Sequence, residues 1–336
     1  MTNQIRDLVT VSRHYGGKPE YVIAGGGNTS WKNREHLYIK ASGISLATID
    51  ESGFCILERS KLALIPSMSL SSDPVVREEQ VKNALMASRT DPESGLRPSV
   101  ETSLHDLFNY AFVVHTHPTL VNGIMCSMEA EEQVKGMFGG QALYIPYSDP
   151  GFVLFTKIRE KILEYRNRHG KDPQMVFIQN HGVFVAAGSI EEIDRIYRAI
   201  DLAITSRIAK LPSKEPLPLS SVMEETLPGV RALLSQGNLK TARAFNNRCI
   251  MPFLSGEETF RKISTPFTPD QMVYCLPEYL FIENNDSAES VTSAIKTKAE
   301  EFRTRKGVDP KVIIIRDHGV IVVEDSPAAV DYLEAL

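Results

Sequence analysis

Cysteine is scarce in this chain of 336 residues, and its four cysteines have no paired spacing. They therefore suggest neither a disulfide framework nor a zinc site built from thiolates, and we expect small core residues in a reducing, cytoplasmic compartment. Long apolar runs and a signal-peptide pattern are also missing, so the sequence predicts no membrane span. The net charge of −5 comes without a cluster of lysine and arginine, which argues against nucleic-acid or anionic-membrane partners.

The length of the chain favours two units, because it exceeds the commonest domain size. Three prolines between Lys210 and Leu219 are incompatible with a regular helix or a central strand. We therefore predict a first domain over residues 1–209 and a smaller C-terminal α/β lobe over residues 210–336. Apolar periodicity indicates an α/β plan. The predicted helices span 2–15, 73–87, 99–110, 151–168, 190–209 and 288–306, and the predicted strands span 37–40, 54–57, 111–115, 142–145, 175–178, 183–186, 279–282 and 312–315.

A weak internal repeat links the two parts. Asn180-His181-Gly182 follows a strand and precedes an amphipathic helix, and Asp317-His318-Gly319 does the same 137 residues later. A repeated unit of this kind indicates a shared structure before it indicates a shared function. No His-Thr-His partner precedes His318 in the second part, so we interpret it as a structural residue or a relic, with Asp317 as a candidate hydrogen-bond acceptor for its ring.

The strongest chemical signal is His115-Thr116-His117-Pro118, at the end of an apolar segment. Side chains alternate between the two faces of a strand, so His115 and His117 project to the same side. Two imidazoles on one face can bind one metal ion. The alternative is a pair of hydrogen-bonded histidines at a strand end, and the apolar lead-in and abrupt proline favour ligation.

His181 follows the strand predicted over 175–178 and precedes Gly182, which places it on a tight turn at a strand end. Alone, it would more often be a hydrogen-bonded turn histidine; with His115 and His117 it becomes a third candidate ligand. Three neutral imidazoles suit zinc better than magnesium or calcium, and they leave a coordination position open for a substrate.

Glu101 is a candidate general base. Ser99 can cap the predicted helix and place Glu101 in its first turn, where a carboxylate is also favoured for purely structural reasons. The same helix leads directly to His115, which would bring Glu101 near the metal. We expect His105, one turn further on, to pack rather than to ligate.

Two loops could bind an anion. Gly25-Gly26-Gly27 precedes Asn28, Thr29 and Ser30, and such a loop can offer backbone N–H groups or simply form a bend. It lacks the spacing of a dinucleotide-binding loop or a P-loop. The segment Lys40-Ala41-Ser42-Gly43 is a second candidate of the same kind.

Taken in order, these segments resemble the class II aldolase/adducin family: the Gly-Asn-Thr-Ser loop, the Ser-Gly loop, a Ser-x-Glu helix start, His-x-His-Pro, a Pro-Tyr segment and Asn-His-Gly. The resemblance spans about residues 5–209. It implies an α/β/α sandwich with a central, mainly antiparallel sheet, a zinc ion on three ligands and a catalytic acid/base at Glu101. The implied zinc ligands are His115, His117 and His181.

The resemblance also implies a phosphate site and a proton donor. The phosphate would be bound by Asn28, Thr29, Ser42, Gly43 and Ser99. Tyr147 is similar to a tyrosine that reaches the site of a neighbouring subunit, which implies a homo-oligomer, with a tetramer favoured. Two positions depart from the family pattern, because Val100 stands where a second serine is common and Ser42 where a threonine is common.

The implied activity is that of a zinc-dependent lyase of carbohydrate metabolism. It would cleave a ketose 1-phosphate of the rhamnulose- or fuculose-phosphate type to dihydroxyacetone phosphate and a short aldehyde, through a zinc-stabilised enediolate. The alternatives are a metal-dependent decarboxylase or epimerase of a sugar-acid or pentulose phosphate, and a non-enzymatic adducin-like binding protein. Residues from about 267 onward resemble the connector in long proteins that fuse such an aldolase to a short-chain dehydrogenase, so the chain is either a stand-alone relative or the aldolase portion of a longer protein.

Overall fold

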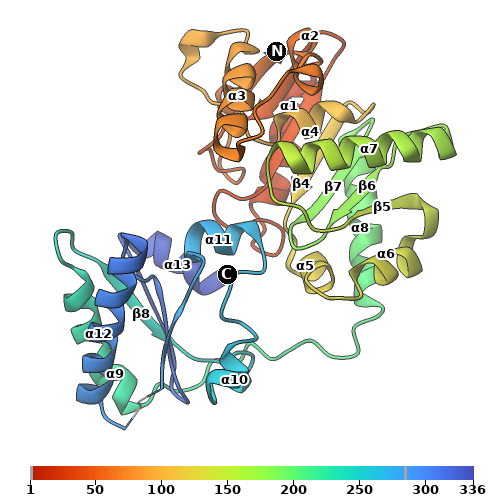
Figure 1. Cartoon of the computed structure of the whole chain (residues 1–336). Coiled ribbons are helices and arrows are strands. Elements are labelled where there is room, and N and C mark those ends of the chain that lie inside the picture. Colours follow the sequence, from red (N-terminus) through yellow and green to blue (C-terminus); the bar gives the residue numbers. More distant parts are fainter. Residues whose placement is uncertain (1–2, 284–285) are drawn as a thin grey trace. The chain divides into compact units, whose positions relative to one another are not determined.

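The structure is a computed structural model that describes residues 3–283 and 286–336 (Figure 1). The chain forms two compact units that divide between Ile208 and Ala209. Each unit is a layered α/β structure with a sheet of its own. No helix in the described ranges is long and apolar enough to cross a membrane.

The first unit is built on a seven-stranded sheet with the order β3-β2-β1-β4-β7-β6-β5. Neighbouring strands are antiparallel except for the parallel pair β5 and β6, so the predicted mainly antiparallel sheet is confirmed. The strands are β1 (Asn28–Lys32), β2 (His36–Lys40), β3 (Phe54–Glu58), β4 (Phe112–Thr116), β5 (Ala142–Ile145), β6 (Met175–Ile178) and β7 (Gly182–Ala187).

Helices cover both faces of this sheet, as the predicted sandwich requires. One face carries α1 (Asn3–Gly16), α5 (Thr119–Met125), α6 (Ala130–Phe138) and α8 (Ile190–Thr205). The other carries α2 (Arg59–Leu62), α3 (Pro74–Ala87), α4 (Thr102–Leu107) and α7 (Phe152–His169). Strand β4 separates the two cores, because Val114 packs on the first side and Val113 on the second.

Most element boundaries follow local signals in the sequence. Asp73 caps α3 by accepting a hydrogen bond from the backbone N–H of Val76 at 2.9 Å, with a proline at the first helical position. Two predictions were wrong. The helix expected over 99–110 is limited to α4, because the carbonyl of Ser99 accepts the backbone N–H of Thr102 in a preceding turn and Asp172 accepts that of Asn109 beyond the helix.

The second error concerns the start of β1, which we expected to be part of a loop. Asn28, Thr29 and Ser30 belong to the strand, where Asn28 pairs with His115 and Ser30 with Ile39. These small polar residues lack the apolar alternation that marks a strand in the sequence. They form a strand because β1 pairs with β2 on one side and with β4 on the other.

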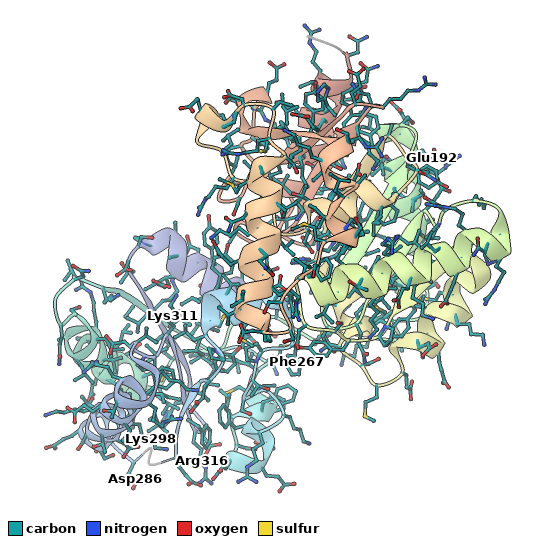
Figure 2. All side chains as sticks on the ribbon, turned by 45° about the horizontal axis from the view of Figure 1, so that its top comes forward. Glu192, Phe267, Asp286, Lys298, Lys311 and Arg316 are labelled. Carbon is teal, nitrogen blue, oxygen red and sulfur yellow. The ribbon has the colours of Figure 1, made fainter. Side chains whose placement is uncertain are left out.

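The second unit has a four-stranded sheet with the order β8-β11-β10-β9. Its strands are β8 (Thr241–Phe245), β9 (Leu280–Ile282), β10 (Val312–Ile315) and β11 (Gly319–Glu324). One face carries α9 (Ser221–Leu234) and α12 (Ala288–Lys306), and the other α10 (Glu257–Phe260), α11 (Pro269–Cys275) and α13 (Pro327–Ala335). Lys298, labelled in Figure 2, ties α12 to β9 by donating to the carbonyl of Phe281 at 2.8 Å.

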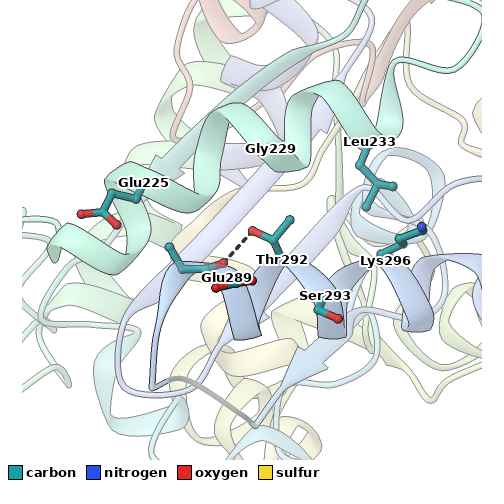
Figure 3. A pocket seen from close by; sticks show the side chains of 8 residues that line it. Glu225, Gly229, Leu233, Glu289, Thr292, Ser293 and Lys296 are labelled. Atoms are coloured by element: carbon teal, nitrogen blue, oxygen red, sulfur yellow. Dashed lines mark hydrogen bonds between the residues drawn. The ribbon is translucent and has the colours of Figure 1, made fainter.

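Helices α9 and α12 lie side by side, with a shallow groove of about 730 Å³ between them (Figure 3). The helices approach closely at Gly229, where an added Cβ would lie 3.4 Å from Cγ2 of Thr292. The hydroxyl of Thr292 donates to the carbonyl of Ala288 at 2.7 Å, within its own helix.

The second sheet repeats four of the seven strands of the first. Strands β8-β11-β10-β9 have the same order and relative directions as β4-β7-β6-β5, including the one parallel pair. Asn180 and Asp317 both have positive φ, 56° and 59°, in equivalent turns. The ion pairs Arg166–Asp172 and Arg303–Asp309 occupy equivalent places before the repeated strands. The repeat predicted from the sequence is therefore a repeated structural unit.

Candidate metal centre

Three imidazoles converge at the end of β4 and the turn between β6 and β7. Nε2 of His115 lies 3.0 Å from Nε2 of His117 and 3.2 Å from Nε2 of His181. Candidate ligand atoms of the three residues all lie within 4.8 Å of one another, and no other group of three such residues occurs in the described part of the chain. The sequence-predicted ligands are thus brought together.

His115 presents an electron pair to the middle of this group. Its Nδ1 lies 3.0 Å from the carbonyl of Val183, which can only accept, so the ring hydrogen is on Nδ1 and Nε2 is free of hydrogen. The ring stacks on Phe184 with centroids 3.9 Å apart and is completely buried. Burial lowers the pKa of His115 well below its ordinary value, so the ring is neutral at neutral pH. A neutral, oriented imidazole is the form that binds a metal ion.

Two glycines allow the backbone to approach this closely. A Cβ at Gly182 would lie 2.4 Å from the carbonyl oxygen of Thr116 and 2.8 Å from Cδ2 of His117. Gly27 has φ of +66°, and a Cβ there would lie 2.7 Å from the carbonyl oxygen of His115. Both positions therefore require glycine if the histidines are to keep their places.

Glu101 faces the same point. Its Oε1 lies 3.3 Å from Nε2 of His115 and 3.3 Å from Nε2 of His181. Oε2 accepts a hydrogen bond from Asn28 at 2.6 Å, whereas Oε1 is buried without a hydrogen-bond partner among the described residues.

This donor set fits a cation. A buried carboxylate oxygen with no hydrogen-bond donor, beside three imidazole nitrogens, lacks the compensation that buried polar atoms need. A zinc ion with nitrogen ligands at about 2.0–2.1 Å is compatible with imidazole nitrogens a little more than 3 Å apart. The residues present therefore fit the group that the sequence predicted for them.

Glu101 reaches this place from the N-cap position of α4, one residue before the first helical turn in which we had expected it. Ser99 Oγ accepts the backbone N–H of Glu101 at 3.2 Å and one N–H of the Asn28 amide at 3.2 Å. Ser99, Asn28 and Glu101 are thus joined directly.

The second candidate anion loop adjoins this segment. The backbone N–H of Ser42 donates to the carbonyl of Arg97 at 2.8 Å. Gly43 has φ of +84° and open space where a Cβ would lie. Ser42, Arg97 and Val100 line a cavity of about 610 Å³ together with residues of α3 and the start of α7. The first segment thus reaches Glu101 through Asn28, and the second contacts Arg97, four residues before Glu101.

The hydroxyl groups of two other predicted site residues have partners outside the histidine group. Thr29 points to the opposite face of β1, where its buried hydroxyl lies 2.6 Å from that of Ser12 in α1. Its assignment to the phosphate site stays a prediction. Tyr147 is 57% exposed, and its hydroxyl donates to Asp149 at 3.1 Å. This hydrogen bond, with partial burial, raises the pKa of Tyr147.

Sequence reasoning missed the alternation of polar residues along β1. Asn28, Ser30 and Lys32 lie on one face and all contact His105: Asn28 and Ser30 through the ring, and Lys32 by donating to the backbone carbonyl at 2.5 Å. The period of two was visible in the sequence. This pattern could not be interpreted from the sequence, because the strand itself was not recognised.

The second unit keeps one of the three imidazoles at the equivalent place. The strand registers place Ala244 where the first unit has His115, and Asn246 where it has His117. Nδ1 of His318 lies 2.6 Å from Oγ of Ser220, and the expected partner Asp317 forms an ion pair with Arg316 at 3.3 Å. The absence of a ligand role for His318 stays a prediction.

Comparison with known proteins places the first unit in a family. Residues 6–203 match the model of the Class II Aldolase and Adducin N-terminal domain. The chain belongs to this family. The matched residues include all three histidines and Glu101, whereas the second unit lies outside the match.

Three individual relatives of this class II aldolase family member are each 27% identical to it or less. An uncharacterized oxidoreductase of Bacillus subtilis (strain 168) is 24% identical over 94% of this chain and 50% of its own length, so the chain spans about half of that relative. The N-terminal class II aldolase domain of a conserved Thermoplasma acidophilum protein is 27% identical, with a TM-score of 0.52 over 61% of this chain and 94% of that one. An L-fuculose-1-phosphate aldolase from Thermus thermophilus is 12% identical, with a TM-score of 0.38 over 61% and 94%.

Proposed function

We propose that this protein is a zinc-dependent aldolase that cleaves a ketose 1-phosphate to dihydroxyacetone phosphate and a short aldehyde. The observation that supports this best is the free Oε1 of Glu101, 3.3 Å from two of the three convergent imidazole nitrogens. A base beside a metal centre suits a reaction in which a carbon next to a carbonyl gains or loses a proton.

The residues of the first unit divide the chemistry between them. His115, His117 and His181 would hold zinc, which when bound supplies Lewis-acid polarisation of a substrate carbonyl. Glu101 holds and returns the proton at the adjacent carbon through Oε1. Asn28 anchors Oε2, so the base keeps one orientation during the transfer.

The phosphate is assigned to Ser99 and to the loop of Ser42 and Gly43. Ser99 Oγ accepts two hydrogen bonds, so its own hydrogen is available to a phosphate oxygen. Gly43 leaves open space beside the loop. Asn28 lies next to this site, but both hydrogens of its amide are already donated to Glu101 and Ser99, so we assign it to the base rather than to the phosphate.

The wider assignments also belong to this proposal. We assign catalysis to residues 1–209 and treat residues 210–336 as a C-terminal lobe. The exposed Tyr147 would donate a proton in the site of a neighbouring copy, within a cytoplasmic homo-oligomer such as a tetramer.

The test is an aldol-cleavage screen of the zinc-loaded full chain on ketose 1-phosphates, including rhamnulose and fuculose phosphates, with a coupled assay for dihydroxyacetone phosphate. We expect cleavage of at least one substrate and loss of that activity in Glu101→Gln. Parallel assays for decarboxylation of a sugar-acid phosphate and for epimerisation of a pentulose phosphate cover the related reactions. Activity confined to one of those assays, or none in any of them, would reject aldol cleavage.

A further inference from the structure

A line of hydrogen bonds connects the interior of the first unit to Glu101 through His105. The imidazole of His105 is completely buried, and its Nδ1 lies 2.7 Å from Oγ of Ser30. Its Nε2 bonds to Oδ1 of Asn28, and Nδ2 of Asn28 donates to Oε2 of Glu101 at 2.6 Å. Ser30, His105, Asn28 and Glu101 therefore form one continuous chain.

Only one arrangement of hydrogens satisfies all of these contacts. The carboxylate of Glu101 can only accept, so Asn28 must turn its NH₂ toward Glu101 and its carbonyl oxygen toward His105. His105 must then carry its hydrogen on Nε2, and the hydroxyl of Ser30 must donate to Nδ1. Burial lowers the pKa of His105 to about 3, which agrees with a neutral ring carrying one hydrogen at neutral pH.

We propose that His105 is a positioning residue for Glu101, acting through the amide of Asn28. By donating to Oδ1 of Asn28 it fixes the amide, and the amide in turn holds Oε2 of Glu101 and leaves Oε1 toward the three histidines. A role in turnover rests on the proposed function, whereas the hydrogen-bond order of the chain does not.

The surroundings hold His105 itself in place. Lys32 donates to its backbone carbonyl at 2.5 Å. The ring of His105 meets Phe184 edge-on with centroids 5.4 Å apart, and Phe184 is itself stacked on the rings of His115 and Phe108. A flipped Asn28 would set its carbonyl oxygen against the carboxylate of Glu101 in a buried site, where two facing acceptors leave a polar group unsatisfied. The rigid placement of His105 therefore determines which end of the amide Glu101 meets.

The first experiment requires no activity. In ¹⁵N-labelled full-length protein, with and without added zinc, long-range ¹H–¹⁵N spectra report the tautomer of each histidine ring, and the signals that are lost in His105→Gln are assigned to His105. We expect His105 to be neutral with its hydrogen on Nε2 from pH 6 to 8. A hydrogen on Nδ1, or a charged ring in this range, would overturn the proposal.

The second experiment separates positioning from a general structural role. His105→Phe keeps an aromatic ring against Phe184 but removes the donor, and His105→Gln supplies an N–H donor again. We expect His105→Phe to lower kcat about 10- to 100-fold, the usual size for partners that orient a metal-site group, with zinc content and KM near the wild-type values. His105→Gln should recover part of kcat.

His169→Phe, at the exposed end of α7, is the matched control for loss of a histidine and should keep wild-type kinetics. Equal loss of kcat in His105→Phe and His105→Gln, together with lost zinc or a large fall in melting temperature, would assign His105 to stability alone. If the wild type cleaves no substrate, the proposed function fails, and the tautomer measurement still decides the hydrogen-bond order.

Discussion

At the scale of single residues, the metal centre depends on how each side chain is fixed. His115 has its tautomer set by the carbonyl of Val183, and Glu101 has one oxygen held by Asn28 and the other free. The three histidines could be predicted from the sequence because a period of two and a strand-end turn are local patterns. The partners of Asn28 could not, because Glu101 and His105 lie more than 70 residues away in the sequence.

Glu101→Gln is the direct test of the base. Glutamine keeps the size of the side chain and can still meet Asn28, but it cannot take up a proton. We expect zinc to be retained, the fold to be unchanged, and turnover of the cleaved substrate to fall by about two to four orders of magnitude, the usual contribution of a positioned general base. Steady-state kinetics and metal analysis on the same preparation measure both effects, and near-normal cleavage would contradict the assigned role.

At the scale of elements, the sheet places the ligands and α4 places the base. The sequence predicted β5, β6 and α3 well. Apolar runs mark the two strands, and the capping residue Asp73 before a proline marks the start of α3. It failed at β1, whose polar side chains make sense only once α4 packs against them. The face on which Thr29 lies could not be predicted for the same reason, since it depends on the register of a strand that was not recognised.

The turn into β7 gives a stability prediction. Gly182→Ala puts a Cβ against Thr116 and the ring of His117, so either the backbone or the ligand must move. We expect the free energy of unfolding to fall by about 1–3 kcal/mol, the usual cost of overpacking, and zinc binding to weaken. The matched control is Gly188→Ala at the exposed position just after the same strand, where the nearest atom is 3.8 Å away, and it should be close to neutral. Urea unfolding and zinc titration compare the two; equal behaviour would mean that the close approach is unimportant.

The buried Lys32 predicts a pH effect on stability. Burial lowers the pKa of Lys32 to about 7 from an ordinary value of 10.5. Between these values the unfolded chain binds a proton that the folded chain does not, so this residue makes the wild type more stable as pH rises from 7 to 10, by at most about 1.4 kcal/mol per pH unit. Below pH 7 both states are protonated and its contribution is constant.

The comparison is with Lys32→Met, which should lack this rise. Lys135→Met, on the exposed surface of α6, controls for the loss of one lysine. Urea unfolding at pH 7, 8, 9 and 10 gives the free energies. A difference between the wild type and Lys32→Met that stays constant over this range would show that Lys32 is charged in the folded protein throughout.

At the scale of the whole chain, one structural unit occurs twice but the candidate centre occurs once among the described residues. The repeat was visible from the sequence because its turns are similar, and the sheets show that it extends to strand order and direction. In the second unit Ala244 and Asn246 stand at two of the three ligand positions. The side chain of Met223 is completely buried beside Gly319, with its Cε 3.3 Å from where a Cβ on Gly319 would lie. We therefore expect the second unit to bind no zinc.

The most direct measurement is the zinc content per chain of the purified, zinc-loaded protein and of two histidine variants. The three convergent imidazoles predict close to one zinc per chain in the wild type, none in His117→Ala, and one again in His318→Asn, whose ring contacts Ser220. Full retention of zinc in His117→Ala, or its loss in His318→Asn, would contradict the assignment of the metal to the first unit.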